Sequence, residues 1–158
     1  KSSFIKAILM HASSELENHN MKFTEEGVLQ TGSGLQISYI NQDTSFLQGS
    51  VEKFCKDRQL DEPLFCAILR QLDMERVQFT KNIEEFSEGQ KKKVLIAASL
   101  LTQAHLYIWD EPLNYIDVFS RMQIEKLLLE YKPTMLIVEH DVRFREKIAT
   151  KVIDIGEK

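Results

Sequence analysis

Residues 86–111, FSEGQKKKVLIAASLLTQAHLYIWDE, decide the expected fold of this chain. Ser87 and Gln90 have the S-x-x-[EQ] spacing of a capping box, which predicts that a helix begins at Ser87. The apolar run 106–109 is typical of a short buried strand, and two carboxylates follow it. A helix that leads directly into an apolar strand is the repeating unit of an α/β fold.

The same alternation continues toward the carboxyl terminus. The expected elements there are a helix at 117–131, a strand at 135–138, a helix at 142–150 and a strand at 152–155. Such alternation predicts parallel strands with helices packed on both faces of the sheet. Ligands bind at the carboxyl ends of strands in these sheets, so the polar residues that follow each strand are the first candidates for a site.

The amino-terminal half predicts further elements of both kinds. They are a helix at 2–12, strands at 21–29 and 35–40 separated by the turn sequence TGSG, and two short helices within 50–76. Ser50 and Asp61 are the expected caps of the two short helices, and Pro63 lies in a first turn, where proline is tolerated.

Composition places the chain among ordinary globular proteins. It has 158 residues, enough for about one domain, of which 43% are hydrophobic and 28% are charged. The net charge of −4 argues against nucleic-acid binding through overall charge, although a local basic patch is compatible with this net charge. No apolar run approaches the roughly 20 residues that span a bilayer, so we expect no membrane span. Cys55 and Cys66 have no metal-site spacing and fit reduced, structural cysteines of a cytoplasmic protein.

The carboxylates after the strand at 106–109 are the strongest candidates for chemistry. Asp110 could hold Mg²⁺, which favours oxygen ligands and keeps several waters. Glu111 could polarise an attacking water as a general base. Taken alone, the same pair also fits a solvated strand end.

Three other positions carry weaker signals. Lys1, Ser2 and Ser3 could be the end of a phosphate-binding P-loop, with the lysine on the phosphates and the Ser2 hydroxyl on Mg²⁺, but such a triplet is common by chance. Gln42 follows a strand and could contact Mg²⁺ or the attacking water, or lie in a polar turn. His140 follows another strand and could hydrogen-bond a phosphate.

Residues 87–93 allow two interpretations. Ser87 and Gln90 could simply cap a helix, or Ser87, Gly89 and the helix N-terminus could bind a phosphate, with the glycine leaving the backbone open to it. The lysines at 91–93 could be a solvated helix face or could touch a polyanion.

The order of these motifs resembles the nucleotide-binding domain of ATP-binding cassette proteins. FSEGQ is similar to the family's signature motif, LYIWDEP to Walker B, and LNYID at 113–117 to the D-loop. The resemblance extends over essentially the whole chain. It implies a P-loop NTPase (RecA-like) α/β fold, with a parallel sheet flanked by helices at 1–45 and 104–158 and an inserted α-helical signature subdomain at 46–103. Because the chain begins at Lys1, the resemblance implies a domain that is incomplete at the N-terminus and truncated inside Walker A.

Within that family, the stretches FSEGQKKK and WDEPLNYIDVFSRMQIEKLL resemble the second nucleotide-binding domain of ABC-F proteins, closest to the bacterial antibiotic-resistance group. This implies an ATPase in the full-length protein that uses ATP and Mg²⁺, acts on the ribosome and protects it from antibiotics. The alternative is the ATPase subunit of an ABC membrane transporter. The partner would be a second ABC domain of the same chain, whereas the isolated fragment is expected to be inactive and prone to self-association.

The resemblance also assigns a role to each candidate residue. Glu111 and His140 would be catalytic, Ser2, Gln42 and Asp110 would hold Mg²⁺, and Lys1, Ser2, Ser3 and Gln42 would bind ATP. Ser87, Gly89 and Gln90 would contact the nucleotide held by the partner domain, and Asn114 and Asp117 would belong to the D-loop. The Glu111 carboxylate would therefore be the base that polarises water, and His140 would contact the γ-phosphate.

Overall fold

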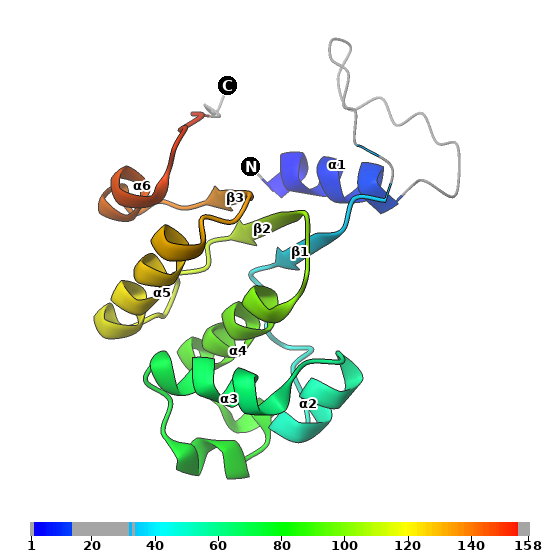
Figure 1. The fold of residues 1–158 in the computed structure, drawn as a ribbon, viewed down its shortest axis with the longest axis vertical. Helices are drawn as coiled ribbons and strands as arrows, with labels where there is room; N and C mark the ends of the chain where they lie inside the picture. Colours follow the sequence, from blue (N-terminus) through cyan, green and yellow to red (C-terminus); the bar gives the residue numbers. More distant parts are fainter. Residues whose placement is uncertain (1, 14–31, 33, 155–158) are drawn as a thin grey trace.

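The computed structural model describes residues 2–13, 32 and 34–154 (Figure 1). In order, the helices and strands are α1 (Ser2–Ser13), β1 (Ile37–Ile40), α2 (Val51–Asp57), α3 (Glu62–Gln71), the short 3-10 helices η2 (Arg76–Thr80) and η3 (Ile83–Glu85), α4 (Glu88–Leu101), β2 (Leu106–Asp110), α5 (Val118–Tyr131), β3 (Met135–Val138) and α6 (Val142–Ile148). From α4 onward helices and strands alternate, as the sequence predicted, whereas only helices lie between β1 and β2.

The described strands form one parallel sheet in the order β1-β2-β3. Ile40 of β1 pairs with Trp109 of β2, and Asp110 of β2 pairs with Val138 of β3. The middle strand is the most buried, because Trp109 has none of its surface exposed. The α/β fold with a parallel sheet flanked by helices is therefore confirmed.

Residues 50–71 fold into the two short helices that the capping residues predicted. The Ser50 hydroxyl accepts a hydrogen bond from the Lys53 backbone N–H at 3.1 Å, and the Asp61 carboxylate accepts one from the Leu64 N–H at 2.8 Å. Each such cap stabilises a helix by about 1 kcal/mol. Pro63 lies in the first turn of α3, where its missing N–H has no helical partner to lose.

Helix α4 joins the helical segment to the sheet. It lies between α3 and the strands in Figure 1, and its residues from 92 to 99 are all buried. A helix that is buried on nearly every side belongs to the interior of a protein. The buried apolar side chains of α2, α3 and α4 form one continuous cluster with those of β1, β2 and α5. Residues 46–103 therefore share a core with the sheet.

A buried polar group anchors α4 to two strands. The Ser99 hydroxyl lies 2.7 Å from the Ser38 hydroxyl of β1, and it accepts a hydrogen bond from the Trp109 indole N–H at 2.9 Å. Buried polar groups require such partners, since leaving one unpaired costs about 1–3 kcal/mol.

Replacing Ser99 with alanine is expected to lower the free energy of unfolding by about 1–3 kcal/mol, because the Trp109 N–H and the Ser38 hydroxyl each lose a partner. Equilibrium unfolding in urea measures this change. Ser45→Ala is the matched control, since Ser45 is exposed and its replacement should change the free energy by less than about 0.5 kcal/mol. Equal stabilities of the two variants would contradict the role given to this group.

Some expected strands differ from the structure. The prediction of a strand at 152–155 is wrong for 152–154, which extend beyond α6 without pairing with any described strand. Apolar sequence alone does not make a strand, because a strand needs a hydrogen-bonded neighbour. The expected strand at 21–29, and residue 155, lie outside the described residues, and β1 begins at Ile37 rather than at residue 35.

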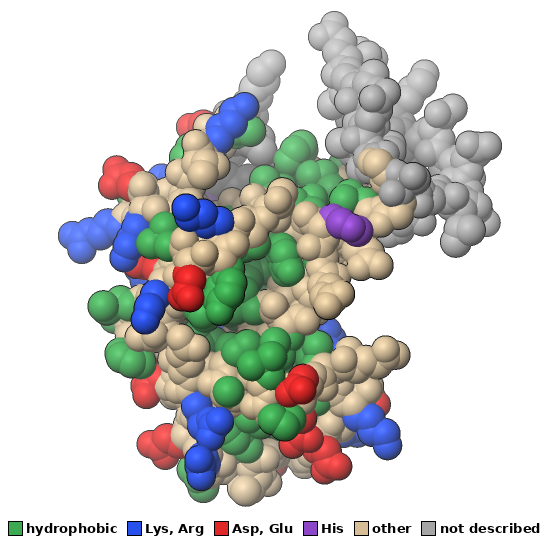
Figure 2. Space-filling view, in the orientation of Figure 1, with side chains coloured by type: hydrophobic (Ala, Val, Ile, Leu, Met, Phe, Trp, Pro, Cys, Tyr) green, Lys and Arg blue, Asp and Glu red, His purple; other side chains and the backbone are tan. Residues whose placement is uncertain are grey.

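Large apolar side chains also remain on the surface. Figure 2 shows hydrophobic side chains gathered across the middle of one face. Among all the described large apolar side chains, Tyr115 and Val118 are the most exposed, at 77% and 74%; Val118 is the first residue of α5 and Tyr115 precedes it. Among the described residues, no helix is both long enough and apolar enough to cross a membrane.

Candidate functional site

The candidate residues that follow the strands lie at one edge of the sheet. Gln42 comes two residues after β1, Asp110 is the last residue of β2, and His140 comes two residues after β3. The parallel arrangement places the carboxyl ends of all three strands at the same edge. Gln42 and His140, which are about 100 positions apart in the sequence, therefore lie at the same edge of the sheet.

The carboxylate of Glu111 is the best-defined group at this edge. One oxygen (Oε1) lies 3.2 Å from the Nε2 of His140, and the other (Oε2) accepts a hydrogen bond from the Asn114 amide at 2.7 Å. The backbone N–H of Glu111 donates to the Val138 carbonyl at 2.9 Å, and its φ of 49° lies in the left-handed region. Holding a non-glycine residue there costs on the order of 1 kcal/mol, so the surrounding contacts fix this side chain in place.

Asp110 is nearly buried beside Glu111. Only 5% of its surface is exposed. The pKa of Tyr39 on β1 is raised, first because Tyr39 is partly buried and second because the Asp110 carboxylate is negatively charged. No group of three or more His, Cys, Asp or Glu residues among those described is placed to hold a metal. A Mg²⁺ ion at this edge would therefore depend on Asp110 together with neutral oxygens, water and phosphate, a ligand set that suits this cation.

The residues assigned to the P-loop are only partly described. Ser3 is exposed in the first turn of α1. Lys1 and the side chain of Ser2 lie outside the described residues, so their assigned contacts stay predictions. Gln42 is exposed in the turn after β1, where its side chain is accessible to a ligand.

The helix at residue 87 begins with the capping box that the sequence predicted. The Ser87 hydroxyl accepts from the Gln90 backbone N–H at 3.3 Å, and the Gln90 side chain accepts from the Ser87 N–H at 3.0 Å. The capping interpretation is confirmed. Phosphate binding by Ser87, Gly89 and Gln90 stays a prediction, and the exposure of Ser87 is compatible with it.

Gly89 has a close neighbour within its own chain. A Cβ atom at this position would lie 2.4 Å from the backbone carbonyl oxygen of Tyr115 in the segment 113–117. Real Cβ atoms do not approach an oxygen so closely, so any other residue would push the two segments apart. Tyr115 itself has a φ of 65°. The sequence suggested that this glycine leaves the backbone open to a phosphate, and the structure shows that a carbonyl of the same chain also needs the space.

Two of the three lysines that follow Gly89 are buried, which corrects both interpretations of 91–93. Lys92 and Lys93 are 2% and 6% exposed, so they form neither a solvated face nor a surface for a polyanion. The Lys93 ammonium lies 2.7 Å from a carboxylate oxygen of Asp117, whereas Lys91 pairs with Glu88 at 3.2 Å. The reason is that this part of α4 faces loops that carry acceptor oxygens.

Asp117 is both the cap of α5 and the partner of Lys93. Its carboxylate accepts a hydrogen bond from the Ser120 backbone N–H at 2.8 Å. Burial by itself would raise the pKa of the Asp117 carboxyl, but the hydrogen bonds from Lys93 and Ser120 outweigh it and hold that pKa below its ordinary value. Segment 113–117 is thus fixed to α4 by an ion pair and by the contact at Gly89.

Sequence reasoning missed Asn41 and Thr44, the burial and the partners of Lys92 and Lys93, and the approach of the Tyr115 carbonyl to Gly89. One signal was present for the lysines. Cations in the first turns of a helix are disfavoured by the helix dipole, so three lysines there indicate acceptor groups close by. Nothing in the sequence identified which acceptors these are.

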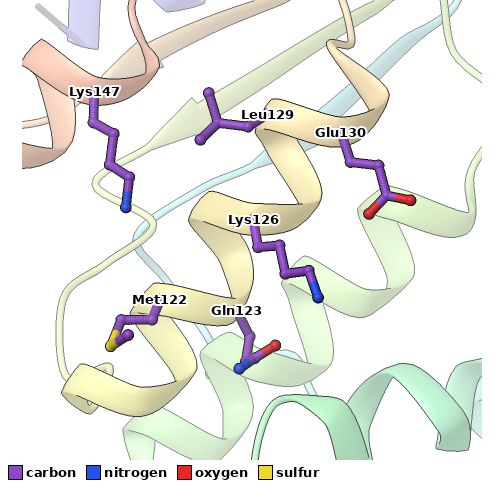
Figure 3. A pocket seen from close by; sticks show the side chains of 6 residues that line it. All are labelled: Met122, Gln123, Lys126, Leu129, Glu130 and Lys147. Atoms are coloured by element: carbon purple, nitrogen blue, oxygen red, sulfur yellow. The ribbon is translucent and has the colours of Figure 1, made fainter.

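A separate open pocket of about 580 Å³ lies away from these motifs (Figure 3). Five of its lining residues come from α5 and the sixth, Lys147, from α6. Lys147 is paired with Glu125 at 2.6 Å. The pocket contains none of the candidate site residues, so the strand-end edge remains the candidate site.

A family model described as "ABC transporter" matches residues 1–114. A protein named "Ribosome protection protein VmlR" from Bacillus subtilis (strain 168) is 32% identical over 136 residues, which is 84% of this chain and 25% of that protein. A "Putative ATP-binding protein YdiF" from the same organism is 28% identical over 136 residues, 84% of this chain and 21% of its own length.

A solved structure has the same fold. In the complex of an archaeal ribosomal stalk protein with the "archaeal ribosome recycling factor aABCE1", the matching chain superposes with a TM-score of 0.66 at 26% identity. The match covers 94% of this chain and 28% of that one. The chain thus spans about a quarter of the length of each of these three proteins.

Proposed function

This chain belongs to the ABC transporter family, and from that membership we propose that it forms part of a nucleotide-binding domain in a longer protein that binds and hydrolyses ATP. Its curated relatives are ABC-F proteins, as the motifs predicted. In this proposal Glu111 polarises the attacking water, and His140 contacts both Glu111 and the γ-phosphate.

The observation that carries this proposal is the contact between Glu111 and His140 at the carboxyl edge of the sheet. A carboxylate positioned by two partners can accept a proton from water, which is the task of a general base. With 22% of its side chain exposed, the carboxylate is accessible to a water molecule. Phosphoryl transfer depends mainly on such positioning and on charge stabilisation.

The remaining assignments concern the phosphates and the cation. Asp110, Gln42 and Ser2 would hold Mg²⁺, which neutralises phosphate charge when bound. Lys1, Ser2 and Ser3 would bind the phosphates of the same nucleotide at the N-terminus of α1. The buried Asp110 carboxylate supports this placement, since it lies at the end of the middle strand.

The capping residues of α4 would serve a second nucleotide. Ser87, Gly89 and Gln90 would contact ATP held by another ABC domain of the same longer chain, with Asn114 and Asp117 close to the shared boundary. The exposure of Ser87 and Asn114 supports this assignment, because a partner domain can reach both side chains.

The most specific part of the proposal concerns the ribosome. One relative is named a ribosome protection protein, and the matching solved chain is titled a ribosome recycling factor. We infer that the full-length protein acts on the ribosome in the cytoplasm, as a second ABC-F nucleotide-binding domain would, and that it protects the ribosome from antibiotics.

The alternative is an ATPase subunit of a membrane transporter. A second ABC domain and a linker in the full-length gene would favour the ribosome, whereas membrane-coupled partner subunits would favour transport.

Co-sedimentation tests the ribosomal proposal. The full-length protein with Glu111→Gln should pellet with ribosomes in the presence of ATP at several times the level seen without ATP, because ATP-bound protein accumulates when hydrolysis is blocked. Glu130→Gln, an exposed change on α5 away from the strand ends, is the control and should sediment like the unmodified protein. Equal pelleting with and without ATP for the Glu111 variant would exclude ATP-dependent ribosome binding.

A further inference from the structure

Helix α4 contacts the loop after β1 at two points, and Gln42 lies between them. The Lys92 ammonium donates a hydrogen bond to the backbone carbonyl of Asn41 at 2.9 Å. The Thr44 hydroxyl donates to a carboxylate oxygen of Glu88 at 2.6 Å. Loop 41–44 is therefore attached to the first two turns of α4 immediately before and shortly after Gln42.

The contact at Lys92 is made inside the protein. Lys92 is 2% exposed, and Thr44 is 5% exposed. A buried ammonium is costly unless nearby groups compensate it. Burial lowers the pKa of Lys92, while the negative charges of Asp110, Glu111 and Glu88 act in the opposite direction. The ammonium therefore binds the loop that carries Gln42, and the charges of Asp110 and Glu111 favour its protonated form.

An apolar side chain would fill this space without the cost of burying a charge. Packing alone therefore does not explain why a lysine occupies this position. Lys93, the next residue, is buried to a similar extent but faces the opposite loop, where it pairs with Asp117. Adjacent lysines of one helix therefore reach two different loops. One loop carries Gln42, and the other contains Asn114.

We propose that Lys92 and Glu88 are positioning residues for Gln42. They act through the backbone of loop 41–44 and touch neither the nucleotide nor the reacting atoms. This inference rests on the proposed function of Gln42 as a ligand of Mg²⁺ or of the attacking water. Because α4 also begins with Ser87, Gly89 and Gln90, the same two contacts link the loop around one nucleotide to the segment proposed for the other.

A double-mutant cycle in the full-length protein tests the inference. Lys92→Met removes the ammonium and keeps most of the apolar stem, and Gln42→Ala removes the positioned group. Each single change is expected to lower kcat for MgATP hydrolysis at least about tenfold, since a misplacement of one ångström can cost about 10²-fold. The double variant should be no slower than the slower single variant, because residues that act as a unit are not additive.

Two further variants keep the result specific. Thr44→Val breaks the second contact without disturbing a buried charge, so it tests the same inference if Lys92→Met does not fold, and it should also be non-additive with Gln42→Ala. Lys93→Met is the matched control on the same helix. Its effect should multiply with that of Gln42→Ala, since it acts through Asp117.

The outcomes separate the inference from the function on which it rests. If Lys92 serves folding alone, Lys92→Met would lower the melting temperature, and its effect on kcat would multiply with that of Gln42→Ala. That result would overturn the inference and leave the ATPase proposal intact. Equal coupling of Lys93→Met to Gln42→Ala would overturn it as well. A full-length protein without MgATP hydrolysis, or with a rate that Gln42→Ala leaves unchanged, would overturn the proposed role of Gln42 and the inference together.

Discussion

Replacing Glu111 with glutamine is expected to slow ATP hydrolysis by the full-length protein by about 10²–10⁴-fold, the range that a general base contributes. Glutamine retains the shape of the side chain and an acceptor oxygen for the Asn114 amide. It cannot take a proton from water. The Mg²⁺-holding groups and the phosphate contacts are unchanged, so ATP binding should persist.

Steady-state release of phosphate measures the rate, and retention of radiolabelled ATP on the purified protein measures binding. Glu130→Gln makes the same chemical change on the exposed side of α5 and should hydrolyse ATP like the unmodified protein. Hydrolysis by the Glu111 variant at the unmodified rate would exclude its role as the base. Loss of ATP binding along with hydrolysis would show that the carboxylate serves mainly to hold the nucleotide.

Replacing Gly89 with alanine is expected to destabilise the protein by about 1–3 kcal/mol, as overpacking in a close-packed region does. Helix propensity alone predicts the opposite sign, because alanine is favoured over glycine within a helix by up to about 1 kcal/mol. The added Cβ would lie 2.4 Å from the Tyr115 carbonyl oxygen, a backbone atom that cannot rotate away. Segment 113–117 would then have to move, and Asn114 with it. ATP hydrolysis should therefore fall more than tenfold, since an ångström of misplacement costs about 10²-fold.

Thermal unfolding, together with the hydrolysis rate of the full-length protein, measures both effects. Gly32→Ala is the matched control, since a Cβ at Gly32 would meet no atom within 4 Å. The control is expected to leave stability and hydrolysis nearly unchanged. If Gly89→Ala instead raised the melting temperature, helix propensity would dominate and the close approach of the Tyr115 carbonyl would not constrain this position.

The sequence predicted the elements whose signals are local. The capping box at Ser87, the caps at Ser50 and Asp61, and the apolar runs of β2 and β3 all formed as expected. Each depends on residues within a few positions of one another. The strands were predicted to be parallel, but only the structure shows that β2 and β3 are neighbours, which places Glu111 beside His140.

Expectations failed where the outcome depended on distant partners. The run at 152–154 has strand-like composition but no described strand beside it. The lysines at 91–93 looked like a solvated run, yet two of them face acceptors of loops 41–44 and 113–117. The sequence also did not indicate which segment approaches Gly89, because that neighbour is Tyr115, which follows β2 in the chain.

By itself, the sequence determined the class of fold, the helix caps and the strand-end carboxylates, because periodicity and capping are properties of short segments. Only the tertiary structure decided the partners of Gly89, Lys92 and Lys93. Whether a lysine is solvated or buried depends on which acceptors the chain brings to it from elsewhere in the sequence. The glycine in FSEGQ is needed for the same reason: its constraint is a backbone carbonyl from a loop 26 residues further along the chain, a contact that exists only once β2 has entered the sheet.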